Sequence, residues 1–258
     1  HAQGRPIYRR DDLPAGSIVA GPALIAEANA TTVVENGWQA KIIDDGHLVL
    51  TRTAQGTTRR KVTTARDPAL IEIFNNLFMS IAEHMGAVLQ STARSVNIKE
   101  RLDFSCAVFD GDGHLIANAP HMPVHLGSMG DSVRAVREKH GPTMTAGDAY
   151  VLNAPYNGGT HLPDITVVTP VILHRHAAPS FYVACRGHHA DIGGNSPGSM
   201  PPTSTTIGEE GVLLDNIALV RDGSFQEQTL RGILSAGPYP ARNIDQNIAD
   251  LKAQAAAN

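Results

Sequence analysis

The sequence has little that would direct the protein to nucleic acid or to a membrane. The formal net charge over 258 residues is -4 and the longest basic run is Arg59-Arg60-Lys61, so no broad positive surface would attract a phosphate backbone. The longest apolar stretches, near 71–89 and 165–173, are too short or too often interrupted by polar residues to span a bilayer, and the N-terminus has no signal-peptide pattern. We therefore expect neither nucleic acid nor a membrane as a partner, and a cytoplasmic location.

The chain also has few cysteines and lacks a phosphate-binding loop motif. The chain has 2 cysteines, Cys106 and Cys185, and each lies within an apolar run that is typical of a strand. Two buried free thiols are the interpretation that this favours; a disulfide or a nucleophilic role is the alternative, the latter because both thiols lie close in sequence to polar motifs. The pattern Gly-x-x-x-x-Gly-Lys-Ser/Thr does not occur, so nothing in these residues indicates that the chain itself binds ATP.

The composition is that of an ordinary globular chain with more than one part. With 42% hydrophobic and 18% charged residues, it can bury one core, or one core and a smaller module. Short β-type runs separated by Gly-Pro, Asn-Gly and Asp-Gly turns predict a small all-β segment over 1–56. Because this segment is short for an independent domain, we expect it to be the end of a larger one. Polar residues without periodicity predict a linker over 57–66.

The third part, 67–258, mixes helix and strand signals. Asp67 suits a helix N-cap and Pro68 the first helical position, ahead of apolar residues that recur at helical spacing up to Leu89. An Asp-Gly-Asp-Gly turn at 110–113 predicts a hairpin and resembles a calcium loop only superficially. Further expected elements are a helix over 131–140, a strand over 148–154 and a helix over 244–257. The predicted fold class is α+β, with mixed or antiparallel sheets and packed helices.

Two glycine-flanked segments, 158–164 and 186–194, carry the residue types that a catalytic metal ion requires. Each follows an apolar run that is typical of a strand, so two strand ends would deliver histidine and aspartate side chains into one region. A third polar cluster, 97–103, adds a glutamate; the alternative for each residue alone is a turn or capping role. Manganese, iron or zinc suits two imidazoles and two carboxylates best, with magnesium as a further candidate. The predicted ligands are Glu100, His161, Asp164 and His188.

Other polar residues are candidates for proton transfer and substrate binding. Alternation would place His121 and His125 on one side of an extended strand, which makes His125 a candidate ligand or proton carrier; the alternative is a loop whose histidines bond to backbone. Guanidinium is a two-pronged donor to carboxylates, so Arg94 and Arg101 are candidates for substrate binding, against the alternative of surface arginines. The predicted catalytic residues are His125, His189 and Asp103.

Four motifs of the third part follow one another in a characteristic order. They are NIKERLDFS at 97–105, PHMPVHLGSM at 120–129, GTHLPD at 159–164 and GHHADIGG at 187–194. On these motifs the chain from about Asp67 to its end resembles the hydantoinase B/oxoprolinase family. Residues before about Leu50 look like the C-terminal end of the partner hydantoinase A half. The whole chain therefore resembles the junction of a fused polypeptide that joins the two halves.

The resemblance implies ATP-dependent ring opening of a small cyclic amide, either 5-oxoproline to glutamate or a hydantoin to its carbamoyl amino acid. It implies that the A-type half, a partner in a homo- or hetero-oligomer, binds ATP, and that the B half holds a divalent metal on the four ligands named above. The alternatives are a subunit of an acetone or acetophenone carboxylase-type enzyme and a non-catalytic assembly module. Because the ATP-binding region is absent and the B half is usually much longer, we expect the chain alone, as a fragment or gene remnant, to be inactive.

Overall fold

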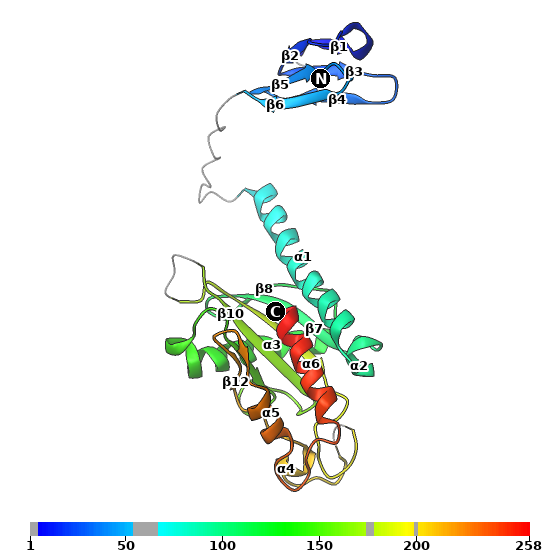
Figure 1. Cartoon of the computed structure of the whole chain (residues 1–258). Helices are drawn as coiled ribbons and strands as arrows, with labels where there is room; N and C mark the ends of the chain where they lie inside the picture. The colour runs from blue at the N-terminus through cyan, green and yellow to red at the C-terminus, as the bar shows by residue number, and fades with distance from the viewer. Residues whose placement is uncertain (1–4, 54–66, 174–177, 199–200) are drawn as a thin grey trace. The chain divides into compact units, whose positions relative to one another are not determined.

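The computed structural model describes residues 5–53, 67–173, 178–198 and 201–258 (Figure 1). The chain divides into two compact units, His1–Ala65 and Arg66–Asn258, and each is described by itself. The linker predicted over 57–66 lies outside the described residues.

The first unit is all β, in agreement with its turn pattern. Its six described strands pair in two three-stranded sheets, ordered β1-β3-β4 and β2-β5-β6, and β1 with β3 is the parallel pair. A small core lies between them, formed by Val19, Ala23, Ile25, Val34 and Ala40. The strands are β1 (Ile7–Arg9), β2 (Ile18–Ala20), β3 (Ala23–Ala26), β4 (Thr31–Val34), β5 (Trp38–Ile42) and β6 (Leu48–Arg52), with a 3-10 turn at Arg10–Asp12.

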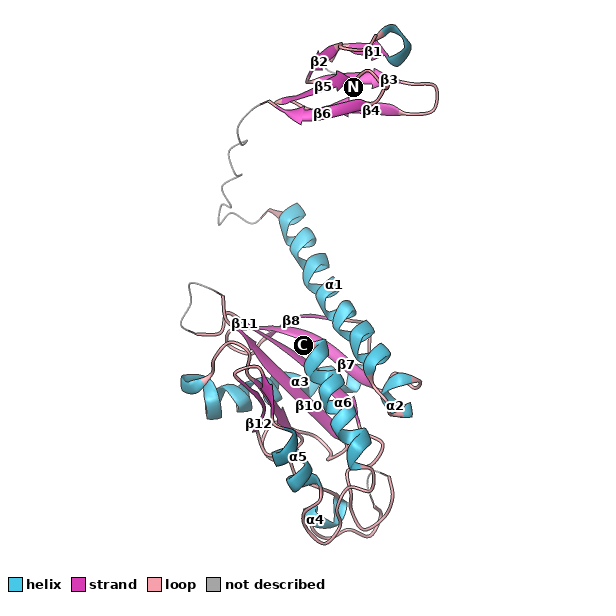
Figure 2. Cartoon of the chain, viewed as in Figure 1, coloured by secondary structure: helices cyan, strands magenta, loops and turns pink. Residues whose placement is uncertain are grey.

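A seven-stranded antiparallel sheet forms the centre of the second unit, in the order β13-β12-β9-β10-β11-β7-β8 (Figure 2). Its longest strands, β10 and β11, lie at the middle and are mostly buried on both faces. The strands are β7 (Phe104–Asp110), β8 (Leu115–Asn118), β9 (Ala149–Leu152), β10 (Asp164–Val171), β11 (Phe181–His188), β12 (Ile217–Arg221) and β13 (Ser224–Phe225).

Helices cover both faces of this sheet, which gives the α+β fold that the mixed signals predict. One face carries α1, α2, α5 and α6, and the other carries α3 (Figure 2). The helices are α1 (Pro68–Thr92), α2 (Val96–Lys99), α3 (Pro123–His140), α4 (Ile207–Glu210), α5 (Glu227–Leu234) and α6 (Ile244–Ala257), with a 3-10 turn at Gly141–Thr143.

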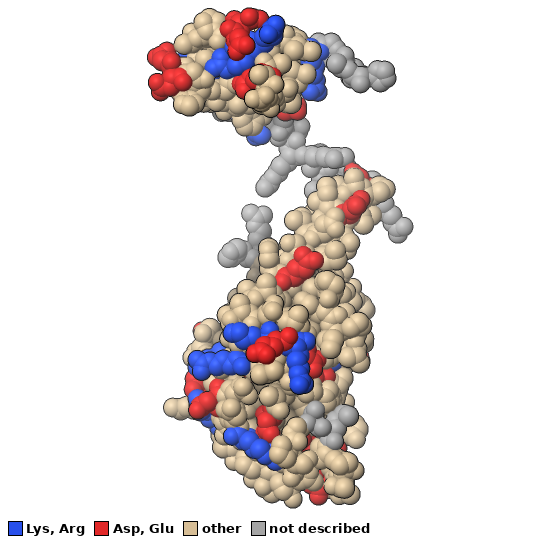
Figure 3. Space-filling model, turned by 90° about the vertical axis from the view of Figure 1, so that its right-hand side faces the viewer, with Lys and Arg blue, Asp and Glu red and all other residues tan. Residues whose placement is uncertain are grey.

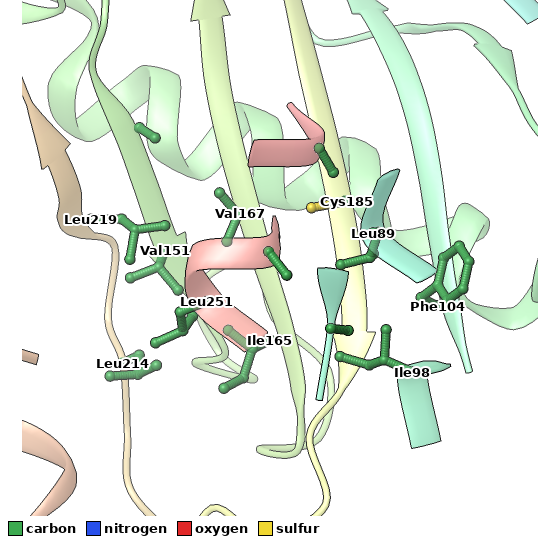
Figure 4. Close-up of a cluster of buried hydrophobic side chains, with 14 of the residues drawn as sticks. Leu89, Ile98, Phe104, Val151, Ile165, Val167, Cys185, Leu214, Leu219 and Leu251 are labelled. Atoms are coloured by element: carbon green, nitrogen blue, oxygen red, sulfur yellow. The ribbon is translucent and has the colours of Figure 1, made fainter. Parts of the chain in front are cut away.

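Side-chain alternation divides the apolar residues of the sheet between two cores. In the larger core, Val167 and Cys185 of neighbouring strands face the side of α6 and α1, where Leu89 of α1 lies near Cys185 and Leu251 of α6 lies near Val151 (Figure 4). The smaller core packs the opposite face of the same strands against α3. Its members are Ala107, Phe109, Met129, Val133, Val136, Met144, Tyr150, Leu152, Val168, Tyr182 and Ala184. The two cores together bury both faces of β10 and β11.

Helix α1 begins at the predicted cap and is only partly covered. Asp67 Oδ1 accepts hydrogen bonds from the backbone N–H groups of Ala69 (3.0 Å) and Leu70 (3.4 Å). Large apolar side chains remain exposed along its first half, and Figure 3 shows that the helix carries few charged groups on the face in view. No helix within the described residues is long and apolar enough to cross a membrane.

The segment around His125 is helical and not extended, which corrects the sequence-based expectation. Pro123 occupies the first turn of α3, so the helix predicted over 131–140 begins eight residues earlier. His125 lies in the first turn, on the α3 face of the sheet. His121 precedes the helix and packs against Phe104, with ring centroids 4.8 Å apart. The two histidines therefore do not share one side of a strand.

The two cysteines are free and buried, as their apolar surroundings predict. They lie directly opposite each other on β7 and β11. Burial raises the pKa of the Cys106 thiol well above its usual range and that of Cys185 to about 12. Both sulfurs are therefore protonated near neutral pH, which argues against a nucleophilic role.

Candidate metal centre

The polar residues gather where three central strands meet at one end of the sheet. Asp164 is the first residue of β10 and His188 the last residue of β11, and the register pairs them directly. Asp103 immediately precedes β7, and its carbonyl accepts a hydrogen bond from the His188 N–H at 3.0 Å. The side chains of these residues project to the α3 face, where the first turn of that helix lies.

A loop held by two glycines brings His161 to the same place. Gly158 has a φ of 87°, a backbone conformation that favours glycine. A Cβ on Gly159 would lie 2.4 Å from backbone atoms of Asn153, so only glycine allows the loop to fold back this closely. Its N–H donates to the Ala154 carbonyl at 2.7 Å. The two glycines before His161 are therefore required for the tight turn that the sequence predicts here.

Asp164 is the hub of the cluster. Its two carboxylate oxygens lie 3.1 Å from His161 Nδ1 and 3.0 Å from His188 Nδ1. One ligand atom from each of these three residues can be chosen so that all lie within 4.8 Å of one another. The side chain of Asp164 is 5% exposed, and those of His161 and His188 are 32% and 16% exposed, so the group faces solvent on one side only.

Asp103 and His125 complete the cluster. His125 Nε2 lies 3.4 Å from Asp164 Oδ2 and 3.7 Å from Asp103 Oδ1, while Asp103 Oδ2 lies 3.9 Å from His188 Nδ1. Two carboxylates and three imidazoles thus face one point. They line an open cavity of about 330 Å³, together with Met122, Val124, Thr160 and Arg186.

The hydrogen bonds of His125 define which ring nitrogen carries a proton. The hydroxyl of Ser105 donates its single hydrogen to the Met122 carbonyl at 2.9 Å. The 3.3 Å contact between Ser105 Oγ and His125 Nδ1 must therefore be donated by the imidazole. In the neutral ring, Nε2 is then the unprotonated nitrogen; when the ring is protonated, Nε2 donates to Asp164 Oδ2 at 3.4 Å. This atom is able to accept a proton or to bind a cation.

The electrostatics of the cluster favour an ionised Asp164. Burial by itself would raise its pKa, but hydrogen bonds from His125, His161 and His188 outweigh burial and hold the pKa well below its usual range. The hydrogen bond between His161 and Asp164 also raises the pKa of His161, although partial burial acts in the opposite direction. In the absence of another cation, protonated imidazole balances the carboxylate.

Four residues predicted to act here lie elsewhere: Glu100, Arg94 and Arg101, and His189 on the opposite face of the sheet. Helix α2 is a single turn with Glu100 at its C-cap, and the chain then passes through Leu102 with a φ of 55°. This turn directs Asp103, and not Glu100, into the cluster. The side chains of Glu100, Arg94 and Arg101 are exposed and do not line the cavity. The backbone N–H of Arg94 donates a hydrogen bond to Asp250 Oδ1 at 2.7 Å, which joins the end of α1 to α6.

His189 faces the opposite side of the sheet from His188, because successive strand residues alternate. Its Nδ1 accepts a hydrogen bond from Asn247 Nδ2 at 3.1 Å, and its Nε2 lies 3.0 Å from Gln254 Oε1. Asn247 Nδ2 also donates to the Asp191 carbonyl, which fixes the orientation of the amide. Burial lowers the pKa of His189, so it is a neutral core residue that joins β11 to α6. The structure gives it no access to the cavity.

The residues present fit a divalent metal ion. Histidine nitrogen and carboxylate oxygen are ligands that manganese, iron and zinc share, and no sulfur ligand lies in the cluster, since both cysteines point to the α6 face. The one-sided exposure leaves a direction from which a substrate can approach.

Comparisons with known proteins agree with the fold and the motifs. The profile of the family "Hydantoinase B/oxoprolinase" matches residues 67–258. A 5-oxoprolinase of Dictyostelium discoideum is 46% identical over 254 residues, which cover 98% of this chain and 19% of that protein. The chain thus spans about a fifth of the length of this relative.

Two solved structures share the fold of about three quarters of the chain. The crystal structure of ATP-dependent caprolactamase from Pseudomonas jessenii superposes with a TM-score of 0.65 at 27% identity, covering 76% of this chain and 32% of that one. The nucleotide-free structure of acetone carboxylase gives a TM-score of 0.62 at 16% identity, covering 74% and 26%, and shows a likeness of fold alone.

The central antiparallel sheet with an Asp-His cluster at its end, taken with these matches, defines the class of protein. The chain belongs to the hydantoinase B/oxoprolinase family.

Proposed function

We propose that the second unit is the metal-bearing part of an ATP-dependent hydrolase that opens a small cyclic amide, 5-oxoproline or a hydantoin. The observation that carries the proposal is the Asp164-centred cluster in a chain of this family. The 46% identity to a 5-oxoprolinase favours 5-oxoproline as substrate. Residues 1–56 would be the end of a hydantoinase A-type half, and the remainder of that half would bind ATP.

His161, Asp164 and His188 would hold the metal, and Asp103 would supply the second carboxylate in place of Glu100. Support comes from Asp103 lying 3.9 Å from His188 Nδ1, whereas the Glu100 side chain is exposed and does not line the cavity. A divalent ion at this point supplies Lewis acidity toward an oxygen of the substrate. Manganese, iron and zinc suit the donor set best.

His125 would carry the proton that the reaction moves. Hydrolysis adds water across a C–N bond, so a proton of the water must reach the nitrogen that leaves the carbonyl carbon. His125 Nε2 faces the cavity with its lone pair, while Nδ1 is held by Ser105. It can accept the proton and return it to nitrogen. Asp164 and Asp103 stabilise the positive charge that the ring holds between these events.

The proposal is tested by reconstitution with a hydantoinase A-type half. We expect no turnover by the chain alone, and ATP-coupled glutamate release from 5-oxoproline when the A-type half is added. Asp164→Asn should abolish this release, and Asp45→Asn, which changes an exposed turn of the first unit, should not. Turnover of acetone with bicarbonate in place of 5-oxoproline would support a carboxylase. Unchanged release by Asp164→Asn would refute the role of the cluster.

A further inference from the structure

An arginine lies directly beneath the cluster and has no place in the proposed chemistry. Arg186 is two residues before His188 on β11, so both side chains project to the α3 face. Arg186 pairs with Thr166 of β10, and two residues further along β11 His188 pairs with Asp164. The Arg186 residue is 0% exposed and forms the floor of the cavity.

The guanidinium is held by four neutral oxygens. Nε donates to Thr166 Oγ1 at 2.8 Å, Nη2 donates to Ser132 Oγ at 2.9 Å, and Nη1 donates to Ser128 Oγ at 2.5 Å and to the His125 carbonyl at 3.5 Å. Among the residues that the structure describes, no carboxylate oxygen lies within 4.0 Å of it. The carboxylates of Asp164 and Asp131 stabilise its charge only from a longer distance. A buried cation without a contacting anion is costly, and an apolar side chain would fill this volume at lower cost. Packing alone does not account for an arginine here.

Two serines extend the arginine toward two different parts of the cluster. Ser128 Oγ accepts from Arg186 and donates to the His125 carbonyl at 3.3 Å. Ser132 Oγ also accepts from Arg186, and it donates to the carbonyl of Gly158, in the loop that leads to His161. Each hydroxyl has one hydrogen, so the guanidinium, by occupying the acceptor side, directs that hydrogen to its carbonyl. One arginine of β11, bonded to Thr166 of β10, thereby holds α3 and the 158–161 loop against these two strands.

We propose that Arg186 is a positioning residue: through Ser128 it sets the place of His125, and through Ser132 it sets the place of His161, relative to the Asp164–His188 pair. This inference rests on the proposed function for the meaning of the site, and on the hydrogen bonds alone for the geometry. Lysine at this position would keep the charge, but its single ammonium cannot reach four oxygens on two elements. Arg186→Lys should therefore fail to replace it.

The test uses cobalt(II) as a paramagnetic probe in the full chain, labelled with 13C-histidine. The His125 and His161 signals, assigned in the metal-free protein by His125→Gln and His161→Gln and followed through a cobalt titration, should be strongly shifted in the wild type. Arg186→Lys should move both signals, Ser128→Ala that of His125 only, and Ser132→Ala that of His161 only. The control is Arg221→Lys, a conservative change of a half-exposed arginine on β12, which should move neither. A merely structural role would lower thermal stability without this separation of the two signals.

A second measurement does not depend on metal. Because Arg186→Lys loses the hydrogen bonds to the two serines, backbone amides at 125–129 and 158–161 should exchange with deuterium about tenfold faster in this variant. Each serine variant should speed exchange in only one of the two segments. If the wild type binds no cobalt, the proposed function fails, and this exchange pattern still decides the inference. If Arg186→Lys does not fold, the two serine variants carry the test. Wild-type signals and exchange rates in the folded variants would overturn the proposal.

Discussion

Substitution of the two adjacent histidines at the end of β11 should affect different properties. His189→Ala should mainly lower stability, and His188→Ala should mainly lower metal binding. His189→Ala removes a buried ring, leaves Gln254 Oε1 without its donor, and takes an acceptor from Asn247 Nδ2. An unsatisfied buried group costs about 1–3 kcal/mol, and the cavity adds to this, so we expect about 3–5 kcal/mol of lost stability. His188→Ala removes one of three imidazoles around Asp164 at a partly exposed position, and should cost about 1–2 kcal/mol in the metal-free chain.

Metal content should follow the opposite order. We expect His188→Ala to lose most of its bound metal, and the folded fraction of His189→Ala to bind as much as the wild type. Urea denaturation of the metal-free proteins gives the stabilities, and mass spectrometry of metal-loaded, folded protein gives the stoichiometry. Loss of metal by His189→Ala at unchanged stability would refute the assignment of the two rings to opposite faces of the sheet.

Three further predictions follow from the same geometry. Asp103→Asn should weaken metal binding by about 10–100-fold and the matched Glu100→Gln by less than about threefold, as measured by competition with a chelator; the reverse order would restore Glu100 as the ligand. In the metal-free chain, the stability from the His161–Asp164 contact should be fully present below about pH 6.5 and fall as pH rises through the raised pKa of His161, so a urea midpoint that is flat across this range, after subtraction of the His161→Gln profile, would contradict the contact. Cys185, with its pKa raised to about 12 by burial, should react with a thiol reagent at least about 100-fold more slowly in native protein than in urea; equal rates would show that the thiol is accessible.

Much of the fold follows from local sequence signals. The Asp67-Pro68 start of α1, the 110–113 hairpin and the strands β2 to β6 of the first unit form where capping and turn residues predict them, whereas β1 (Ile7–Arg9) is not predicted by them. The helical start of α3 does not, because Gly127 and Gly130 weaken the helix signal and Pro123 suits a loop as well as a first helical turn. Packing of Met129 and Val133 on the sheet decides between the two.

The sequence predicts that histidines and carboxylates form a cluster, but it predicts only some of the residues that belong to it. Motif spacing brings His161, Asp164 and His188 together, since two of them end paired strands. Choosing between Glu100 and Asp103 requires the φ of Leu102, which no sequence pattern gives. Strand alternation could have separated His189 from His188, had the register of β11 been known.

Arg186 also had a signal in the sequence. It is a charged residue near the end of an otherwise apolar strand, and the period of two places it on the same face as His188. Its partners on α3 could not be inferred, because that contact depends on a helix start which the sequence leaves ambiguous. Positioning residues of this kind emerge only when the tertiary packing is known.

The metal content of the purified chain tests the central claim most directly. Mass spectrometry of the wild type, beside the His161→Ala/Asp164→Ala double variant, should show about one manganese, iron or zinc ion per wild-type chain and a loss of that ion in the variant. Circular dichroism must show that both proteins are folded. A folded wild type without metal, or equal metal in the folded double variant, would contradict the account.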